Sequence, residues 1–166
     1  MNLSPKQKAA GAILAAFFVM RAIYCHRRRY LPPCDSRLLL HVWGPCWVKL
    51  RHRDGFHTGI DFAVNHGDEV RASMAGIIEF AGHDDERASG GGSGIKVDLR
   101  HDDGSLTRYA HLMGYKRGLA VGDRVEAGQI IGFAGASGHT KSRPRLHFEI
   151  RTPEGLHQDP MDLIRW

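Results

Sequence analysis

The sequence predicts an all-β protein, a single antiparallel β-sheet domain preceded by an N-terminal apolar helix. Short runs in which apolar and polar residues alternate recur along the chain, and glycines separate them. No stretch after residue 40 keeps a helical period for even ten residues. With 166 residues, of which 42% are hydrophobic, the chain can fill the core of one such domain.

The first element, residues 1–25, is predicted to be a signal-anchor segment. An unbroken apolar run, Ala9 to Met20, follows two lysines, is interrupted by Arg21 and then meets a cluster of arginines. The run fits the apolar core of an export signal better than a complete membrane span, and no small-x-small cleavage site follows it. We therefore expect an uncleaved, weak membrane anchor over residues 9–25. An amphipathic or buried helix at the start of the domain is the alternative.

Residues 26–40 are rich in proline and arginine and are predicted to be a linker, so that the folded domain spans residues 41–166. The three cysteines, Cys25, Cys34 and Cys46, lie at or before the start of this domain and form no CxxC pair. A disulfide between two of them in an oxidising compartment and three reduced thiols in the cytosol both fit this pattern.

Strand-length alternations fill the rest of the chain. They lie at residues 47–50, 59–64, 76–80, 95–99, 106–110, 129–133 and 146–150. Residues 84–94 are too polar and glycine-rich to pack, and we expect a mobile loop that borders a groove.

The positive charge of the chain is regional. Residues 1–53 hold ten Lys/Arg and one acidic residue, whereas residues 54–166 hold thirteen and seventeen. A nucleic-acid-binding face would have to be built in the folded part, which is slightly acidic, so we expect no nucleic-acid partner for the domain. A basic arm that binds anionic lipid or nucleic acid is a weaker alternative.

Histidines and carboxylates mark the candidate chemistry. Most of the eleven histidines lie in polar contexts and are expected to be exposed: His26, His41, His52, His66, His83, His101 and His157. His57 and Asp61 are four residues apart on a predicted strand, so both side chains point to one face. His147 shares a strand face with Arg145 and Glu149, and His111 shares one with Thr107 and Tyr109. On any one of these strands alone, such a row of polar side chains is more typical of a sheet face that is simply exposed to water.

Together these residues favour a metal site. A catalytic zinc ion takes three protein ligands and leaves a fourth position for water, and His57, Asp61 and His147 supply three suitable side chains. His111 would then be a spare base.

In these motifs the sequence resembles the M23 family of zinc metallopeptidases, the lysostaphin/LytM-type peptidoglycan endopeptidases. The matching segments, in order over about residues 50–166, are Phe56 to Asp61, Tyr109 to Leu112, Gly122 to Gly132, Leu146 to Ile150 and Asp159-Pro160. The resemblance implies an antiparallel β domain with a groove, Zn²⁺ held by His57, Asp61 and His147, and hydrolysis of peptidoglycan peptides. It implies a catalytic role for His111, and we assign Tyr109 beside it to substrate binding.

One position departs from the family pattern. The family has His-x-His before the last ligand, and here Arg145 replaces the first of these histidines, which normally is a second catalytic residue. Arginine stays protonated and cannot act as a general base, although it could stabilise an oxyanion. The preceding segment, residues 138–143, also differs, and His139 is a candidate substitute base.

We therefore predict a zinc endopeptidase that hydrolyses peptidoglycan stem peptides or cross-bridges, with Arg145 contributing electrostatically to catalysis. The alternative is a catalytically weak or inactive relative that binds cell-wall peptide or regulates a partner hydrolase. We expect an exported or membrane-anchored protein acting in the periplasm or cell wall, either a phage lysis or virion-associated enzyme or a bacterial envelope enzyme. The arginines that follow the anchor would tend to hold the C-terminal domain in the cytoplasm, which conflicts with action at the cell wall. The membrane topology therefore stays open.

Overall fold

A computed structural model describes residues 29–45, 55–84, 92–138 and 143–166. The described residues form a nearly all-β domain, which confirms the predicted fold class, and the only helical element among them is one short 3₁₀ turn. The elements are β1 (Leu39–His41), β2 (Gly44–Pro45), β3 (Phe56–His57), β4 (Ile60–Ala63), β5 (Glu69–Arg71), β6 (Gly76–His83), β7 (Ile95–Arg100), β8 (Leu106–Tyr115), β9 (Arg124–Val125), β10 (Ile130–Ala134), β11 (Arg145–Arg151), β12 (His157–Gln158) and η1 (Pro160–Asp162).

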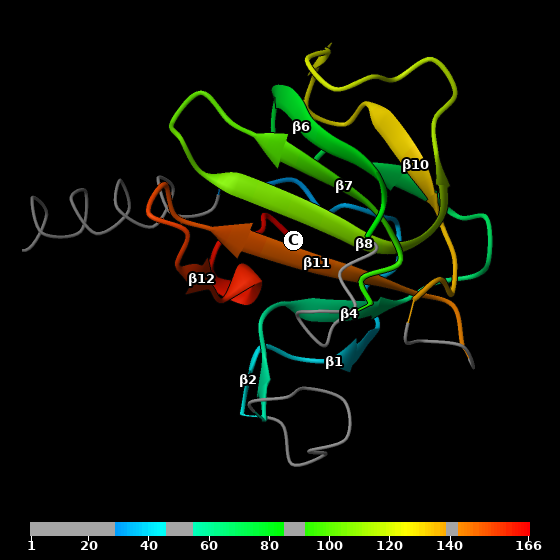
Figure 1. Cartoon of the computed structure of the whole chain (residues 1–166). Coiled ribbons are helices and arrows are strands. Elements are labelled where there is room, and N and C mark those ends of the chain that lie inside the picture. Colours follow the sequence, from blue (N-terminus) through cyan, green and yellow to red (C-terminus); the bar gives the residue numbers. More distant parts are fainter. Residues whose placement is uncertain (1–28, 46–54, 85–91, 139–142) are drawn as a thin grey trace, which may run out of the picture.

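Ten strands form one antiparallel sheet. Its main path runs β1-β4-β11-β8-β7-β6-β9, while β10 joins β8 to β5 and β12 pairs with β11. The long strands β8 and β11 cross the middle of the molecule side by side, and β4 lies along the other edge of β11 (Figure 1). Strands β2 and β3 form a separate two-stranded ribbon. Strands β11 and β8, which carry His147 and His111, therefore lie inside the sheet, and β4, which carries Asp61, is the next strand beyond β11.

The core lies on one face of this sheet. On β11 the apolar residues Leu146, Phe148 and Ile150 are fully buried in it, while His147 and Glu149 point to the other face. The neighbouring strands add the remaining large apolar side chains, among them Ile60, Phe62, Ile78, Val97, Leu99, Tyr109, Leu112 and Ile131. Each such side chain stabilises the fold by about 1.5–3 kcal/mol when it leaves water. This burial fixes which face of each strand can carry polar chemistry.

The folded domain begins earlier than the predicted boundary at residue 41. Tyr30 is completely buried in the core, and its backbone binds the C-terminal segment through hydrogen bonds from Tyr30 N to Leu163 O (3.2 Å) and from Arg165 N to Tyr30 O (2.8 Å). Cys34 is also buried with a free thiol, whose pKa burial raises to about 11. At least residues 29–40 are therefore part of the domain rather than a linker, because proline and arginine content does not reveal packing of single residues.

Several predictions fall outside the described residues. They concern the N-terminal helix and anchor, the strand at 47–50, Cys25, Cys46, His139 and most of the loop at 84–94. No helix in the described part of the chain is long and apolar enough to cross a membrane. The other six predicted strands all appear as β4, β6, β7, β8, β10 and β11.

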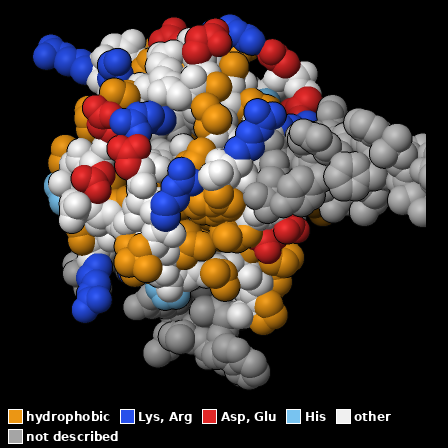
Figure 2. All heavy atoms as spheres, turned by 180° about the vertical axis from the view of Figure 1, so that it is seen from behind, with side chains coloured by type: hydrophobic (Ala, Val, Ile, Leu, Met, Phe, Trp, Pro, Cys, Tyr) orange, Lys and Arg blue, Asp and Glu red, His pale blue; other side chains and the backbone are white. Residues whose placement is uncertain are grey.

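Exposed apolar side chains remain on the surface. On the face opposite to that of Figure 1, apolar groups lie near the centre with basic and acidic side chains around them (Figure 2). The most exposed large ones in the described residues are Leu38, Leu156, Val121 and Val42. Since apolar atoms contribute more than half of the surface of ordinary soluble proteins, this exposure by itself requires no partner.

His101, predicted to be exposed, is buried at 3% exposure. Its Nδ1 donates to Ala75 O (2.9 Å), and its Nε2 is paired with the Thr107 hydroxyl (2.9 Å), which in turn lies 3.1 Å from the Tyr109 hydroxyl. The Tyr30 ring packs edge-on against it, with ring centroids 5.8 Å apart. Burial lowers the pKa of His101 below 6.5, so the folded protein holds it neutral.

Acidification should therefore destabilise the protein through His101. Because the folded pKa lies below the unfolded value of 6.5, the unfolded chain binds the proton first. This contribution to stability is complete above that value and is lost as the pH falls below it. We expect the fall of the melting temperature between about pH 7.5 and pH 5 to be shallower in His101→Gln than in the wild type; equal slopes would contradict this assignment.

A candidate metal centre on strands β3, β4 and β11

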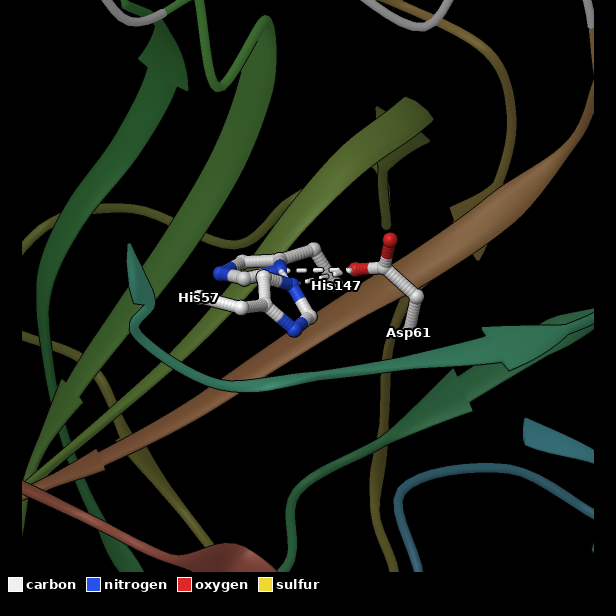
Figure 3. Close-up of side chains that lie close together, drawn as sticks. All are labelled: His57, Asp61 and His147. Carbon is white, nitrogen blue, oxygen red and sulfur yellow. Dashed lines mark hydrogen bonds and ion pairs between the residues drawn. The ribbon is translucent and has the colours of Figure 1, made fainter. Parts of the chain in front are cut away.

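Three ligand atoms meet on the face of the sheet opposite the core. His57 Nε2 lies 3.2 Å from Asp61 Oδ1 and 3.1 Å from His147 Nδ1, and His147 Nδ1 lies 2.8 Å from Asp61 Oδ1. All three side chains are buried and point toward one another (Figure 3). Zinc–ligand bonds of about 2.0–2.1 Å in tetrahedral geometry place ligand atoms about 3.3 Å apart. The arrangement thus fits a zinc ion with small adjustments.

Strand register brings these residues together. On the antiparallel pair β4–β11, Asp61 lies directly opposite His147. His57 precedes β4, and the chain between them approaches β11 so closely that a Cβ on Gly59 would lie 2.2 Å from Phe148 O. Only glycine allows this approach, so Gly59 is required to bring His57 over the strand that carries His147.

Outer hydrogen bonds orient both imidazoles. His57 Nδ1 donates to Val42 O (2.8 Å), and His147 Nε2 donates to Glu149 Oε1 (3.0 Å). A carbonyl and a carboxylate can only accept, so in the neutral rings the lone pair falls on the nitrogen that faces the cluster. Burial lowers the pKa of His147, but hydrogen bonds with Asp61 and Glu149 outweigh it and raise the pKa to about 9. A metal ion bound here must displace this proton.

Glu149 connects several elements behind His147. Its carboxylate accepts hydrogen bonds from Thr58 Oγ1 (2.6 Å) and from Arg151 Nε and Nη2 (3.0 and 2.6 Å), and His157 Nε2 lies 3.5 Å away. Burial raises the pKa of Glu149, but the hydrogen bond from His147 and the positive charges of His147 and Arg151 hold it well below its usual range. Glu149 is therefore an anion that fixes His147. The alternation of polar residues on β11 was a signal for it, since Glu149 lies two residues after His147.

The second oxygen of Asp61 has two cationic or donor partners. His41 Nδ1 lies 2.9 Å and Arg145 Nη1 3.2 Å from Asp61 Oδ2. Burial raises the pKa of Asp61, but the contacts with His147 and His57 outweigh it and hold it far below its usual range. His41 was expected to be exposed, and its side chain is 37% exposed, but pairing of β1 with β4 also places it opposite Asp61. Strand β1 has only three residues, which is too short for an alternation pattern to predict that His41 faces Asp61.

A β-bulge places His111 beside the cluster. Ile95 pairs with Leu112 while Val97 pairs with Tyr109, so β8 has one more residue than β7 at this point. His111 has a φ of 64°, the only positive value of a non-glycine residue in the described chain. Such bulges redirect single side chains and are frequent next to active sites.

The redirected His111 ring lies 5.9 Å from that of His147, centroid to centroid. Its Nδ1 donates to Ser137 O (3.0 Å), which leaves Nε2 as the acceptor of the neutral ring. Burial, and then the positive charge of His147, lower the pKa of His111 to about 4. At neutral pH His111 is therefore an uncharged base.

The same bulge corrects the assignment of Tyr109. The expected shared face of Tyr109 and His111 does not exist, because the extra residue breaks the alternation of β8. Tyr109 is fully buried, packs against Phe148 at 5.3 Å between ring centroids, and accepts a hydrogen bond from Ser73 N (2.7 Å). It is a core residue and cannot line a substrate site.

Comparisons with known proteins agree with this geometry. Residues 55–161 match the family model of Peptidase family M23. The chain is 39% identical over 113 residues to the DD-carboxypeptidase/endopeptidase Mpg of Neisseria meningitidis, covering 68% of this chain and 21% of that protein. It is 39% identical over 115 residues to the glycyl-glycine endopeptidase ALE-1 of Staphylococcus capitis, covering 67% of this chain and 30% of that protein. The chain thus spans less than a third of the length of these relatives.

Solved structures show the same fold. The catalytic domain of lysostaphin from Staphylococcus simulans superposes with a TM-score of 0.64 at 34% identity, covering 75% of this chain and 89% of that one. A zinc-containing peptidase from Vibrio cholerae has a TM-score of 0.64 at 27% identity, covering 81% of this chain and 40% of that one.

The contact between Glu149 and His147 gives a testable prediction. Glu149→Gln keeps an oxygen acceptor but removes the charge behind His147, and loss of such outer partners typically costs 10–100-fold in metal affinity. We expect a loss of this size in zinc affinity, measured by competition with a chromophoric chelator. Glu79→Gln is the matched control, because Glu79 also accepts two hydrogen bonds from an arginine (2.6 and 2.9 Å), but on the exposed surface. Unchanged affinity in Glu149→Gln would refute this role.

Proposed function

Because the chain belongs to peptidase family M23, we propose that it is a zinc-dependent endopeptidase that hydrolyses peptide bonds in peptidoglycan stem peptides or cross-bridges. The observation that carries the proposal is the convergence of His57, Asp61 and His147, with ligand atoms 2.8–3.2 Å apart and the imidazoles oriented from outside. The cluster lies within the part of the chain that matches the family.

The three ligand residues and His111 would have different roles in hydrolysis. Zinc held by His57, Asp61 and His147 would lower the pKa of a bound water and polarise the scissile carbonyl. His111 is neutral at physiological pH and offers Nε2 as a proton acceptor beside this site, while Ser137 O fixes its orientation. The pKa of His111, about 4, keeps it available as a base throughout the neutral range.

The proposed substrate class rests on the relatives. Their names specify different bonds: a DD-carboxypeptidase/endopeptidase from Neisseria, a glycyl-glycine endopeptidase from Staphylococcus and an L-Ala–D-Glu endopeptidase from Bacillus subtilis. The name of a fourth relative, the peptidoglycan DD-endopeptidase ShyC of Vibrio cholerae, gives the polymer. We therefore propose peptidoglycan peptides as the substrate class and specify no single bond.

Arg145 favours a second candidate, a catalytically weak or inactive module that binds wall peptide or regulates a partner hydrolase. It replaces a family histidine that normally acts in catalysis, and its Nη1 lies 3.2 Å from Asp61 Oδ2. The retained ligand geometry and the neutral His111 argue for the enzyme, since a binding module needs neither. We assign Arg145 to the charge compensation of Asp61 rather than to catalysis.

The location of the protein is proposed from its N-terminal sequence. The apolar run within residues 9–25, between lysines and arginines, supports membrane anchoring or export, with action at the cell wall or in the periplasm. A role in phage lysis or on the virion is a narrower proposal of the same kind.

Cleavage of intact peptidoglycan sacculi tests the proposed function. The full-length protein is incubated with zinc and sacculi, and released peptides are identified by mass spectrometry. We expect new peptide ends that disappear with a chelator and in His147→Ala, and that persist in His66→Ala, which removes an exposed histidine away from the cluster. Stoichiometric zinc binding without cleavage of sacculi of several cross-bridge types would instead support the binding module.

A further inference from the structure

Arg145 is a permanent cation buried next to a buried carboxylate. Its side chain is 8% exposed and that of Asp61 is 5% exposed, and Nη1 lies 3.2 Å from Asp61 Oδ2. Its Nε is buried and has no hydrogen-bond partner, so the guanidinium is not held there by a complete set of hydrogen bonds. Such a position is costly for a charged group unless the attraction to a nearby anion offsets the cost.

Asp61 needs such a counter-charge when no metal is bound. A carboxylate taken out of water must be paired, and the attraction between two opposite charges is stronger in a buried site than in water. His57 and His147 contact Oδ1, while Arg145 and His41 contact Oδ2. Of these four partners, arginine is the one whose charge does not depend on pH.

A divalent metal ion would supply the same compensation through Oδ1. Arg145 and the metal would then both be cations beside one carboxylate, and they would repel each other across it. By thermodynamic linkage, a group that stabilises the metal-free protein more than the metal-bound protein weakens metal binding by the same free energy.

We propose that Arg145 is a resident counter-charge for Asp61 that competes electrostatically with zinc. It keeps the ligand cluster assembled without metal and makes the site bind zinc more weakly than the same three ligands would with a neutral residue at position 145. This inference rests on the zinc site proposed above and concerns the affinity of that site rather than the reaction.

The structure contains a matched control pair. Arg108 donates from Nε and Nη2 to Asp98, both at 2.8 Å, with side chains 17% and 7% exposed. Asp98 and Arg108 lie opposite each other on β7 and β8, and Arg108 is also the register partner of Glu149 on β11. This pair has the same chemistry on neighbouring strands, but its carboxylate is not one of the three ligands.

The test compares Arg145→Met, Arg145→Gln and Arg145→Lys with Arg108→Met in the full-length protein. Gln keeps a donor for Asp61 but removes the charge, whereas Lys keeps the charge. The zinc dissociation constant is measured by chelator competition at fixed pH and ionic strength, and melting temperatures are recorded with and without zinc.

We expect the zinc dissociation constants of Arg145→Met and Arg145→Gln to fall at least tenfold, with a lower melting temperature in the absence of metal. Arg145→Lys should stay within about threefold of the wild type. Arg108→Met should lower both melting temperatures equally and leave zinc affinity unchanged. If Arg145→Met does not fold, Arg145→Gln is judged by the same criteria.

Weaker zinc binding in the neutral variants would overturn the inference and make Arg145 a support for Asp61 geometry. Unchanged binding would also overturn it, since the two cations would then not be coupled. A wild-type protein that binds no zinc would refute the proposed function, and this inference with it.

Discussion

The register between β4 and β11 is the constraint on which the site depends. Asp61 lies opposite His147 only because Phe62 pairs with Leu146 and Ile60 with Phe148 on the core face. A slip of one residue would turn the apolar set outward and the histidine inward, so burial of the core holds the register against it. The free energy that stabilises the fold is thus the same free energy that assembles the candidate metal ligands.

Charge compensation is the second organising feature. Two buried carboxylates, Asp61 and Glu149, lie on either side of His147, and each has an arginine on its outer side, Arg145 and Arg151 respectively. The negative charge of Glu149 lies behind the ligand nitrogen and favours a metal ion, whereas the positive charge of Arg145 opposes one. We therefore expect residues outside the ligand set to tune the affinity of the site for zinc.

The sequence allowed the fold class to be predicted because the alternation of apolar and polar residues reveals the long strands. The candidate metal ligands were predicted chiefly through the resemblance to the M23 family, since the spacing of His57 and Asp61 is weak evidence alone and the two residues lie on separate strands, β3 and β4. It did not predict the bulge at His111, which removes Tyr109 from the site, because a single inserted residue leaves no mark in an alternation pattern. Nor did it predict the contact of His41 with Asp61, which depends on the pairing of β1 with β4, or the burial of Tyr30 against the C-terminal segment. Both contacts join residues far apart in the chain. The departure at Arg145 was visible in the sequence, but its contact with Asp61 required the structure.

The central claim is that His57, Asp61 and His147 bind one zinc ion, and anomalous X-ray scattering tests it most directly. Crystals of the zinc-loaded protein, measured on both sides of the zinc absorption edge, should show one strong difference peak about 2.0–2.2 Å from His57 Nε2, Asp61 Oδ1 and His147 Nδ1. A peak elsewhere, or no peak at these three atoms in a protein saturated with zinc, would contradict the account.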